Sequence, residues 1–352
     1  MFSTNLKLAI RSIWKNKSNS FINLAGLTVG ITACLLIGLF VQHELSYDRW
    51  NPNMDRLVRI TTDVKFGESQ LRMTTSSANV GPEANEIMPE VEAFCRIRQY
   101  GDFLVKIEGQ QNYKEEDVLL ADNSFFQLFP TGIIAGDPTS LLKEPQTLAL
   151  SATLANKYFG SPQNAVGKNL ILDNDDTYQV TGVFNDLPTT NHFDADMVLT
   201  LVGIQEVEEA PPFWVTNNNF HTYLLLNPSV TIDQFQTKWA QVVEGKLTTA
   251  LEKLIQSTKE EFEATGQYLK IEAQPLADIH LHSDFDFALK ATGDYAYVWI
   301  FSLIGLMILI IACINYMNLS TAKSANRTKE IAVRKVLGSH RGSLIQQFLT
   351  ES

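Results

Sequence analysis

Two long apolar stretches dominate the pattern of hydrophobic and polar positions in this chain of 352 residues. Residues 21–41 form a run of 21 positions without a charge, and residues 298–322 form a run of 25. A helix needs about 20 residues to cross a hydrocarbon core about 30 Å thick. The pattern therefore predicts two transmembrane helices, with residues 42–297 between them.

The charged residues divide along the same lines. Residues 1–20 carry four basic residues and no acid, and residues 323–352 carry six basic residues and two acids, so each end has a net charge of +4. The region between them has 18 basic and 37 acidic residues, a net charge of −19. Basic flanks stay on the cytoplasmic side. We therefore expect both ends inside and residues 42–297 outside, and the acidic outer region argues against a nucleic-acid partner.

Two other interpretations of the first apolar stretch were weighed. A cleaved signal peptide has an apolar core of about 7–15 residues and a small-residue cleavage site. Here the core is longer, and no Ala-x-Ala pattern ends it. The sequence ITAC at 31–34 is similar to a lipoprotein-processing box, but apolar residues continue to Val41. An uncleaved anchor accounts best for the stretch, with lipidation as the alternative.

The first 30 residues also contain two features of membrane helices. Residues 1–20 predict an amphipathic helix in the inner membrane interface, interrupted at 16–20 before the span. Its apolar face holds Leu6, Ile10, Ile13 and Trp14. Within the span, Gly26 and Gly30 lie four residues apart and would let another helix approach closely.

The outer region alternates between strand and helix patterns. Strands are predicted at 56–66, within 95–122, at 168–188 as a hairpin, at 219–228 and at 267–276. Helices are predicted at 79–94 with an interruption at Pro89, at 123–130, at 151–160 and at 231–266. The fold class is thus an α+β extracytoplasmic domain between two transmembrane helices. We expect two lobes, one from about 42–130 and 219–297, and a β-rich lobe of about 131–218 inserted in it.

Little in the sequence indicates chemistry. The segment GSPQNAVGKNL at 160–170 lacks the spacing and the Ser or Thr of a phosphate loop, so a turn before a strand is expected there. His280 and His282 could bind zinc or copper with nearby aspartates, but a polar strand returning to the membrane explains the same residues and is favoured, so no metal site is expected. Cys95 is the one cysteine outside the spans and is expected to be a buried apolar residue. We expect neither a cofactor nor an enzymatic activity.

Two separated parts of the chain resemble the MacB-like, FtsX-like permeases of ABC transporters. The segment from 305 to the end is similar to the start of the FtsX-like module, and residues 121–188 are similar to the periplasmic core domain of that family. The resemblance covers nearly the whole chain, and its most specific part is residues 315–338. The matching positions there are Asn315, Asn318, Leu319, Ser320, Ala322, Arg327, Glu330, Ile331, Arg334, Lys335 and Gly338.

The resemblance implies that residues 323–352 begin with a coupling helix that docks on a separate ATPase subunit. The residues suit that role, since Glu330 and Arg334 lie four apart and Gly338 would end the helix. The expected docking residues are Arg327, Glu330, Ile331, Arg334, Lys335, Val336 and Gly338. From the residues alone, a basic helix on anionic lipid is an equal alternative.

The family further implies an inner-membrane permease that relays ATP-driven motion to its periplasmic domain for export or efflux. Its expected partners are an ABC ATPase, a second permease copy or half, membrane lipid, and a periplasmic adaptor with an outer-membrane channel. The alternatives are an FtsX-like regulator of cell-wall hydrolases and an extracytoplasmic sensor. Family members have at least four spans, so we expect this sequence to be a piece of a longer chain. The sequence does not indicate the substrate.

Overall fold

The computed structural model describes residues 17–107, 109, 111–173 and 176–336, with side chains from 25 to 318 and at Val336. It divides into two compact units. One contains the two long helices, and the other is the outer domain, Ser46–Asp294. The predicted amphipathic helix lies outside the described residues except for its last four positions, 17–20.

The two long helices are α2 (Lys17–Glu44) and α10 (Tyr295–Val336). Within them, Ala25–Glu44 and Tyr295–Asn318 are long and apolar enough to cross a membrane. The predicted interruption at 16–20 is wrong for the described part, because α2 already begins at Lys17. None of residues 17–20 is glycine or proline, so nothing in them stops the helix.

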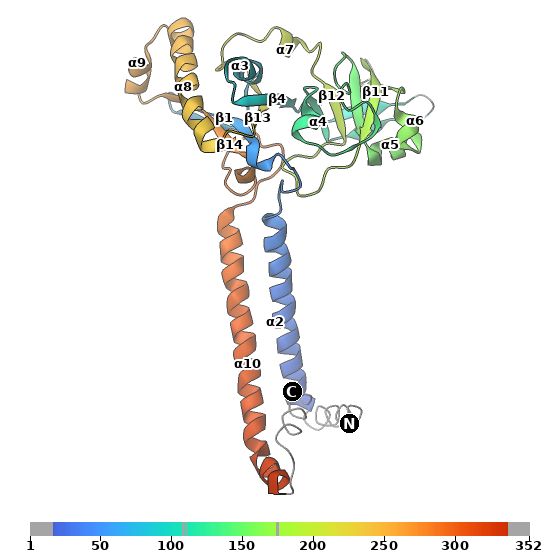
Figure 1. The fold of residues 1–352 in the computed structure, drawn as a ribbon, viewed down its shortest axis with the longest axis vertical. Helices are drawn as coiled ribbons and strands as arrows, with labels where there is room; N and C mark the ends of the chain where they lie inside the picture. The colour runs from blue at the N-terminus through green and yellow to red at the C-terminus, as the bar shows by residue number, and fades with distance from the viewer. Residues whose placement is uncertain (1–16, 108, 110, 174–175, 337–352) are drawn as a thin grey trace. The chain divides into compact units, whose positions relative to one another are not determined.

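The outer domain is built on one mixed sheet, which has fourteen strands among the described residues (Figure 1). The strands are β1 (Leu57–Phe66), β2 (Ser69–Met73), β3 (Ser76–Ser77), β4 (Val91–Arg98), β5 (Phe103–Lys106), β6 (Tyr113–Glu115), β7 (Val118–Ala121), β8 (Ile133–Gly136), β9 (Thr147–Ser151), β10 (Asn169–Leu172), β11 (Asp176–Phe184), β12 (Met197–Thr200), β13 (Asn218–Leu226) and β14 (Tyr268–Pro275). The helices are α3 (Val80–Ile87), α4 (Phe125–Leu128), α5 (Ala152–Phe159), α6 (Pro162–Ala165), α7 (Gln205–Glu208), α8 (Ile232–Ala250) and α9 (Lys259–Ala264). Three short helices complete it: η1 (Met54–Arg56), the π-helical η2 (Leu251–Ile255) and η3 (Leu276–Asp278).

The strand order along the sheet is β14-β1-β13-β4-β7-β12-β9-β11-β10-β5-β6, with β2, β3 and β8 attached to β1, β13 and β11. Most neighbours are antiparallel, but β7–β12 and β9–β11 are parallel. Strands β5 and β6 pair with β10, so part of the sequence before residue 131 lies with the predicted inserted lobe. The regions predicted as two lobes therefore share one continuous sheet.

Several local predictions are confirmed. Helix α5 begins at Ser151, whose Oγ accepts from the N–H of Leu154 at 3.2 Å, and ends at Gly160 with φ +75°. The hairpin β10–β11, the strands β5, β6 and β7, the part of β4 from Cys95 onward, and the strands β1, β13 and β14 lie where the alternation predicts them.

Two helix predictions are wrong in extent. The helix expected at 79–94 ends at Ile87, because Met88 precedes Pro89 and adopts an extended backbone, and β4 follows at once. The helix expected at 231–266 ends as α8 at Ala250 and η2 at Ile255, and α9 begins anew. Thr258 starts α9 with a capping box to Glu261, a pattern visible in the sequence.

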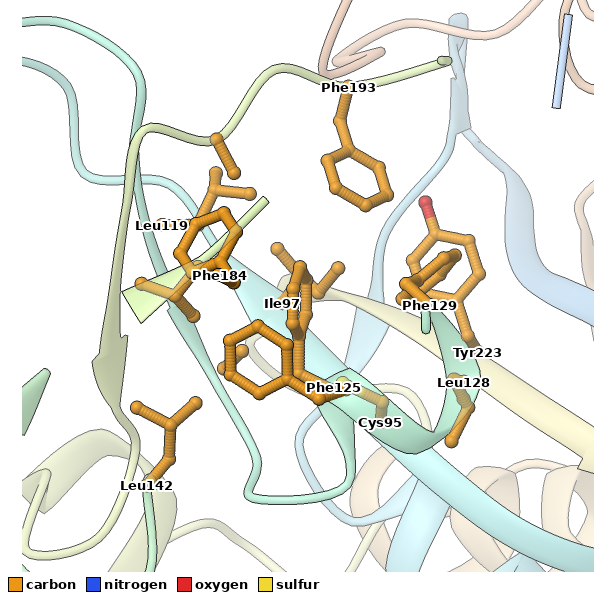
Figure 2. Close-up of a cluster of buried hydrophobic side chains, with 14 of the residues drawn as sticks. Cys95, Ile97, Leu119, Phe125, Leu128, Phe129, Leu142, Phe184, Phe193 and Tyr223 are labelled. Atoms are coloured by element: carbon orange, nitrogen blue, oxygen red, sulfur yellow. The ribbon is translucent and has the colours of Figure 1, made fainter. Parts of the chain in front are cut away.

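Three clusters of buried side chains hold the outer domain together. One lies under α8 and α3 at the β14 end of the sheet and includes Trp214, Phe235 and Trp239. A second fills the end formed by β5 and β9–β12. The third lies between them, where Figure 2 shows Phe125, Phe129, Phe193 and Tyr223 gathered around Ile97. Full burial of one such aromatic ring contributes about 1.5–3 kcal/mol. Because the middle cluster lies between the other two, this stabilisation links the two ends of the sheet.

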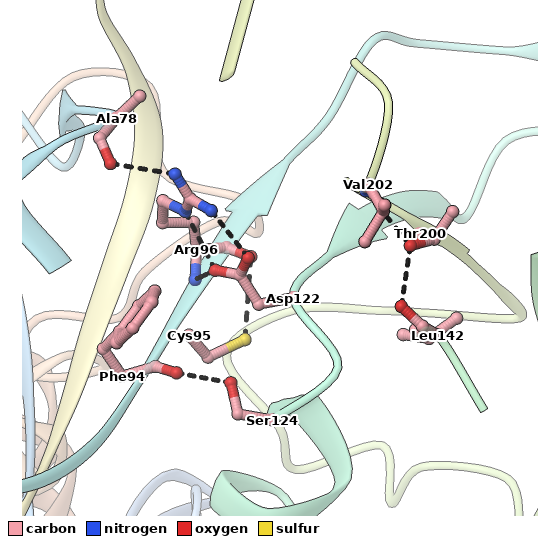
Figure 3. Close-up of polar contacts among 9 residues, drawn as sticks. All are labelled: Ala78, Phe94, Cys95, Arg96, Asp122, Ser124, Leu142, Thr200 and Val202. Atoms are coloured by element: carbon pink, nitrogen blue, oxygen red, sulfur yellow. Dashed lines mark hydrogen bonds and ion pairs between the residues drawn. The ribbon is translucent and has the colours of Figure 1, made fainter. Parts of the chain in front are cut away.

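A buried ion pair lies where β4 meets β7, beside the middle cluster (Figure 3). Asp122 accepts from the backbone N, Nε and Nη2 of Arg96 at 2.7, 2.9 and 2.8 Å, and Arg96 Nη1 donates to the carbonyl of Ala78 at 3.0 Å. Burial raises the pKa of the neighbouring Cys95 thiol well above its ordinary value. Cys95 is fully buried, as expected from the sequence.

The two outermost strands of the sheet differ in their surroundings. At β14, the carbonyls of Ile271 and Ala273 accept from Trp239 Nε1 and Gln236 Nε2 of α8, both at 3.0 Å. At β6, Lys114 lies in the strand and pairs with Asp102 at 2.5 Å and Glu116 at 3.1 Å.

Candidate functional site

The two long helices contact each other along one narrow stripe on each. On α10 the stripe is formed by Val298, Ser302, Gly305, Ile308 and Ala312, spaced three or four residues apart. On α2 a Cβ added at Gly30 would lie 3.4 Å from Cβ of Ala312, and one added at Gly26 would lie 4.0 Å from Asn315 Nδ2. Cys34 Sγ lies 3.3 Å from the carbonyl of Gly305. Small side chains thus allow this contact, and both predicted packing glycines face α10.

The remaining surface of both helices is apolar and exposed. On α2, Val29 and Leu35 are 68% and 64% exposed, and on α10, Trp299 and Ile311 are each 65% exposed. Water would make this exposure costly, at about 25 cal/mol for each Å² of apolar area. Such helices are suited to lipid or to contact with further membrane helices.

The basic segment predicted to be a coupling helix is a direct continuation of α10. The helix runs unbroken for 42 residues from Tyr295 to Val336, about 63 Å at 1.5 Å per residue. The predicted span ends at residue 322, so the helix extends 14 residues, or about 21 Å, beyond it. The structure therefore places the backbone of six of the seven predicted docking residues on this extension, namely Arg327, Glu330, Ile331, Arg334, Lys335 and Val336. Val336 is exposed, and Gly338 lies outside the described residues.

His280 and His282, which the sequence suggested as metal ligands, lie in a turn. The prediction that they belong to an extended strand is therefore wrong. The turn follows η3. The ring of His280 stacks on Tyr47 with centroids 3.3 Å apart, and His282 Nδ1 lies 3.4 Å from Asp278 Oδ1. Within the described residues, no group of three or more His, Cys, Asp and Glu side chains could hold a metal ion. The segment compared with a phosphate loop forms α6, capped by Ser161, before β10.

A buried polar cluster in the outer domain was not predicted. His192 Nδ1 lies 2.7 Å from Asp48 Oδ1, and His192 Nε2 lies 2.8 Å from the hydroxyl of Tyr223. Arg59 pairs with Tyr223 across β1 and β13, and its Nη2 donates to Gln274 at 2.7 Å and to Ser283 at 3.0 Å. Arg59, Tyr223 and Asp48 are each at most 1% exposed. Far-apart segments of the outer domain are thus joined by polar contacts inside it.

Burial sets the electrostatics of this cluster. It lowers the pKa of Arg59 and raises that of Tyr223, while the nearby Arg59 charge opposes the second shift. It also lowers the pKa of His221 to about 3, helped by the charge of Arg59. His221 is therefore neutral at neutral pH, and Tyr223 keeps its proton. These groups are enclosed, so their arrangement favours a structural connection over chemistry on a substrate.

The family model described as MacB-like periplasmic core domain matches residues 20–242, and the model described as FtsX-like permease C-terminal matches residues 302–352. The chain belongs to the MacB-like permease family. It is a membrane protein with an extracytoplasmic domain, and the predicted fold class is confirmed.

Three solved structures are similar to this chain. A domain classed as part of a permease from Porphyromonas gingivalis is 25% identical, with a TM-score of 0.52, covering 64% of this chain and 91% of that one. The periplasmic region of MacB from Actinobacillus actinomycetemcomitans is 12% identical, with a TM-score of 0.39, covering 62% and 90%. The extracellular domain of the ABC-type transporter YknZ from Gram-positive bacteria is 10% identical, with a TM-score of 0.37, covering 61% and 98%. A search of curated proteins found no match.

The family places the buried cluster in the extracytoplasmic domain. Sequence reasoning missed it because Asp48, Arg59, His192 and Tyr223 are separated by up to 175 positions. One signal was present, since Arg59 interrupts an otherwise apolar alternation at the start of β1. A charged side chain in such a position needs a partner.

Proposed function

We propose that this MacB-like permease relays ATP-driven motion from a separate ABC ATPase to its extracytoplasmic domain, in export or efflux. The observation that supports this is the continuity of α10 from Tyr295 to Val336. An unbroken helix has its backbone hydrogen bonds in series along the axis, so it is stiff over this length. A displacement at the basic end would thus move the membrane-spanning part with it.

The predicted spans themselves offer no charged site for a substrate. Residues 21–41 and 298–322 contain no Asp, Glu, Lys or Arg, whereas ionisable residues within spans mark substrate pathways. This supports a role in transmitting motion. ATP hydrolysis is then expected on the partner subunit. A second permease copy and a periplasmic adaptor with an outer-membrane channel are further expected partners, and the inner membrane is the expected location.

Charge reversal on the basic extension tests the proposal. In the permease co-expressed with its ATPase, the double variant Arg334→Glu/Lys335→Glu is expected to reduce recovery of the ATPase on purification by tenfold or more. Like-charge contacts at an interface can cost several kcal/mol, and about 1.4 kcal/mol is a tenfold change. Surface substitutions usually change folding stability by about 0.5 kcal/mol or less, so the variant permease is expected to fold.

The control is Lys168→Glu/Lys253→Glu, which changes the net charge equally through exposed lysines of the outer domain. It should leave ATPase recovery unchanged. Full recovery of the ATPase with the Arg334/Lys335 variant, together with weakened binding to anionic vesicles, would instead assign the basic extension to lipid.

A further inference from the structure

One irregular loop of the outer domain is held by both of the chain segments that adjoin the long helices. This loop, residues 188–194, connects β11 to β12 in the inserted lobe. On one side, the N–H of Asp48 donates to the carbonyl of Thr190 at 2.8 Å, and Asp48 Oδ1 lies 3.3 Å from the N–H and 2.7 Å from Nδ1 of His192. Asp48 comes four residues after Glu44, the last residue of α2.

The other side of the 188–194 loop is held by the segment that leads to α10. Lys290 Nζ donates to the carbonyl of Thr189 at 3.2 Å and pairs with Asp194 Oδ1 at 2.8 Å. Lys290 comes five residues before Tyr295, the first residue of α10. Connectors of four or five residues span at most about 14–18 Å when extended. Any larger displacement of either helix must therefore reach Asp48 or Lys290.

The loop is anchored firmly in the domain. Asn191 and Phe193 are fully buried, and the ring of Phe193 packs edge-on against Phe129 with centroids 5.0 Å apart (Figure 2). Asp48 has a φ of +58°, a conformation that residues other than glycine rarely adopt unless their contacts hold them there. The contact is thus buried and specific on the Asp48 side and half-exposed on the Lys290 side.

The hydrogen bonds continue from the loop into the sheet. His192 Nδ1 faces Asp48 Oδ1 at 2.7 Å, and on the other side of the ring His192 Nε2 lies 2.8 Å from the hydroxyl of Tyr223 in β13. The 188–194 loop is therefore bonded both to the membrane-adjoining segments and to strand β13 of the sheet.

We propose that the 188–194 loop couples the membrane-adjoining segments to the inserted lobe, with Asp48 and Lys290 as its positioning residues. This rests on the proposed function, in which the long helices move. The loop leads directly into β11 and β12, so a pull through Asp48 or Lys290 is delivered to the strands of that lobe. The other lobe, of about 42–130 and 219–297, carries α8 and is called the α8 lobe here. It does not depend on this route, because β1 and β14 connect it to the same segments through η1 and η3.

Spin-label distances in the permease–ATPase complex test the coupling. Labels at Gln163→Cys in the inserted lobe and Tyr297→Cys in α10, both exposed positions, report the first route. Labels at Lys253→Cys and Tyr297→Cys report the α8 lobe. All are placed in a background with Cys34, Cys95 and Cys313 replaced by Ala. Distances are measured without nucleotide and with ATP and vanadate.

Lys290→Met is expected to double the width of the Gln163–Tyr297 distance distribution or more, and to leave the Lys253–Tyr297 distribution unchanged. Loss of one half-exposed ion pair should move the melting temperature by no more than about 2 °C. The control, Lys143→Met, removes an exposed lysine of the same lobe and should change neither distribution.

Asp48→Asn tests the other side of the loop with labels at Gln42→Cys and Gln163→Cys. Asparagine tolerates the positive φ, so the backbone is not strained further. The same broadening is expected. Unchanged Gln163 distributions in both variants, with and without nucleotide, would overturn the coupling role. Failure of the ATPase to co-purify would overturn the proposed function instead. The widths of the distance distributions measured without nucleotide would still decide the role of the loop.

Discussion

Removal of the Asp122 carboxylate is expected to destabilise the outer domain more than most single substitutions. Asp122→Ala leaves the Arg96 guanidinium, whose side chain is 10% exposed, with the carbonyl of Ala78 as its remaining hydrogen-bond partner among the described residues. Loss of one partner from a buried pair costs about 3–5 kcal/mol. The Asp122 side chain is 16% exposed, which favours the lower end, about 3 kcal/mol. For a domain of this size that corresponds to a melting temperature lower by about 6–12 °C.

The measurement is thermal unfolding in detergent, followed by fluorescence of the buried, stacked pair Trp214 and Trp239. Asp102→Ala is the matched control, because it removes an exposed carboxylate from Lys114 and should cost about 1 kcal/mol or less. The double variant Arg96→Met/Asp122→Leu should recover much of the loss, since no buried charge is left. A cost below about 1 kcal/mol for Asp122→Ala would refute the role given to this pair.

Two further predictions concern pH and the helix pair. The pKa of His221 is about 3 in the folded protein, against an ordinary value of 6.5. Between pH 6.5 and 3 the imidazole of His221 is therefore protonated only in the unfolded chain. The free energy of unfolding should then fall by about 1.4 kcal/mol for each pH unit of acidification. His221→Gln should remove that slope, as checked by denaturant titrations from pH 6 to 4; an unchanged slope would contradict the assignment. In the helix pair, Gly30→Leu should destabilise the contact by about 1–3 kcal/mol, whereas Gly38→Leu, whose Cβ meets nothing within 4 Å, should not. Thermal unfolding in detergent separates the two, and equal effects would show that close approach at Gly30 is unimportant.

The parts of the fold that depend on local pattern could be predicted from the sequence. Charge-free runs predicted the membrane helices, and alternation predicted β1, β13, β14, the β10–β11 hairpin and the strands within 95–122. The strands β2, β3, β8, β9 and β12 were not predicted. The errors arose where a local signal was outweighed or overlooked. Pro89 marks the end of a helix and the start of a strand rather than an interruption within one helix. The capping box at Thr258 marks the start of a new helix, which was overlooked because the helical pattern of residues 231–266 looked continuous.

The buried contacts could not be predicted because they depend on tertiary arrangement. His192 lies in an irregular loop, and its partners are 144 and 31 positions away. No spacing rule relates such residues. The docking residues on α10 are a different case. Their role was predicted from the family resemblance, and the structure shows that their backbone is helical. Their function stays a prediction until the charge-reversal experiment is done.

The two ends of the sheet have a consequence for the protein outside the membrane. An outermost strand with free carbonyls and N–H groups can add a strand from another chain, which leads to aggregation. At β14, donors from Trp239 and Gln236 already occupy two of those carbonyls, and at β6 a charged lysine lies within a strand of three residues. Extension of the sheet by unrelated chains is thereby disfavoured at both ends. Substitutions at Gln236 or Lys114 would thus reveal themselves first as loss of solubility, while the fold itself persisted.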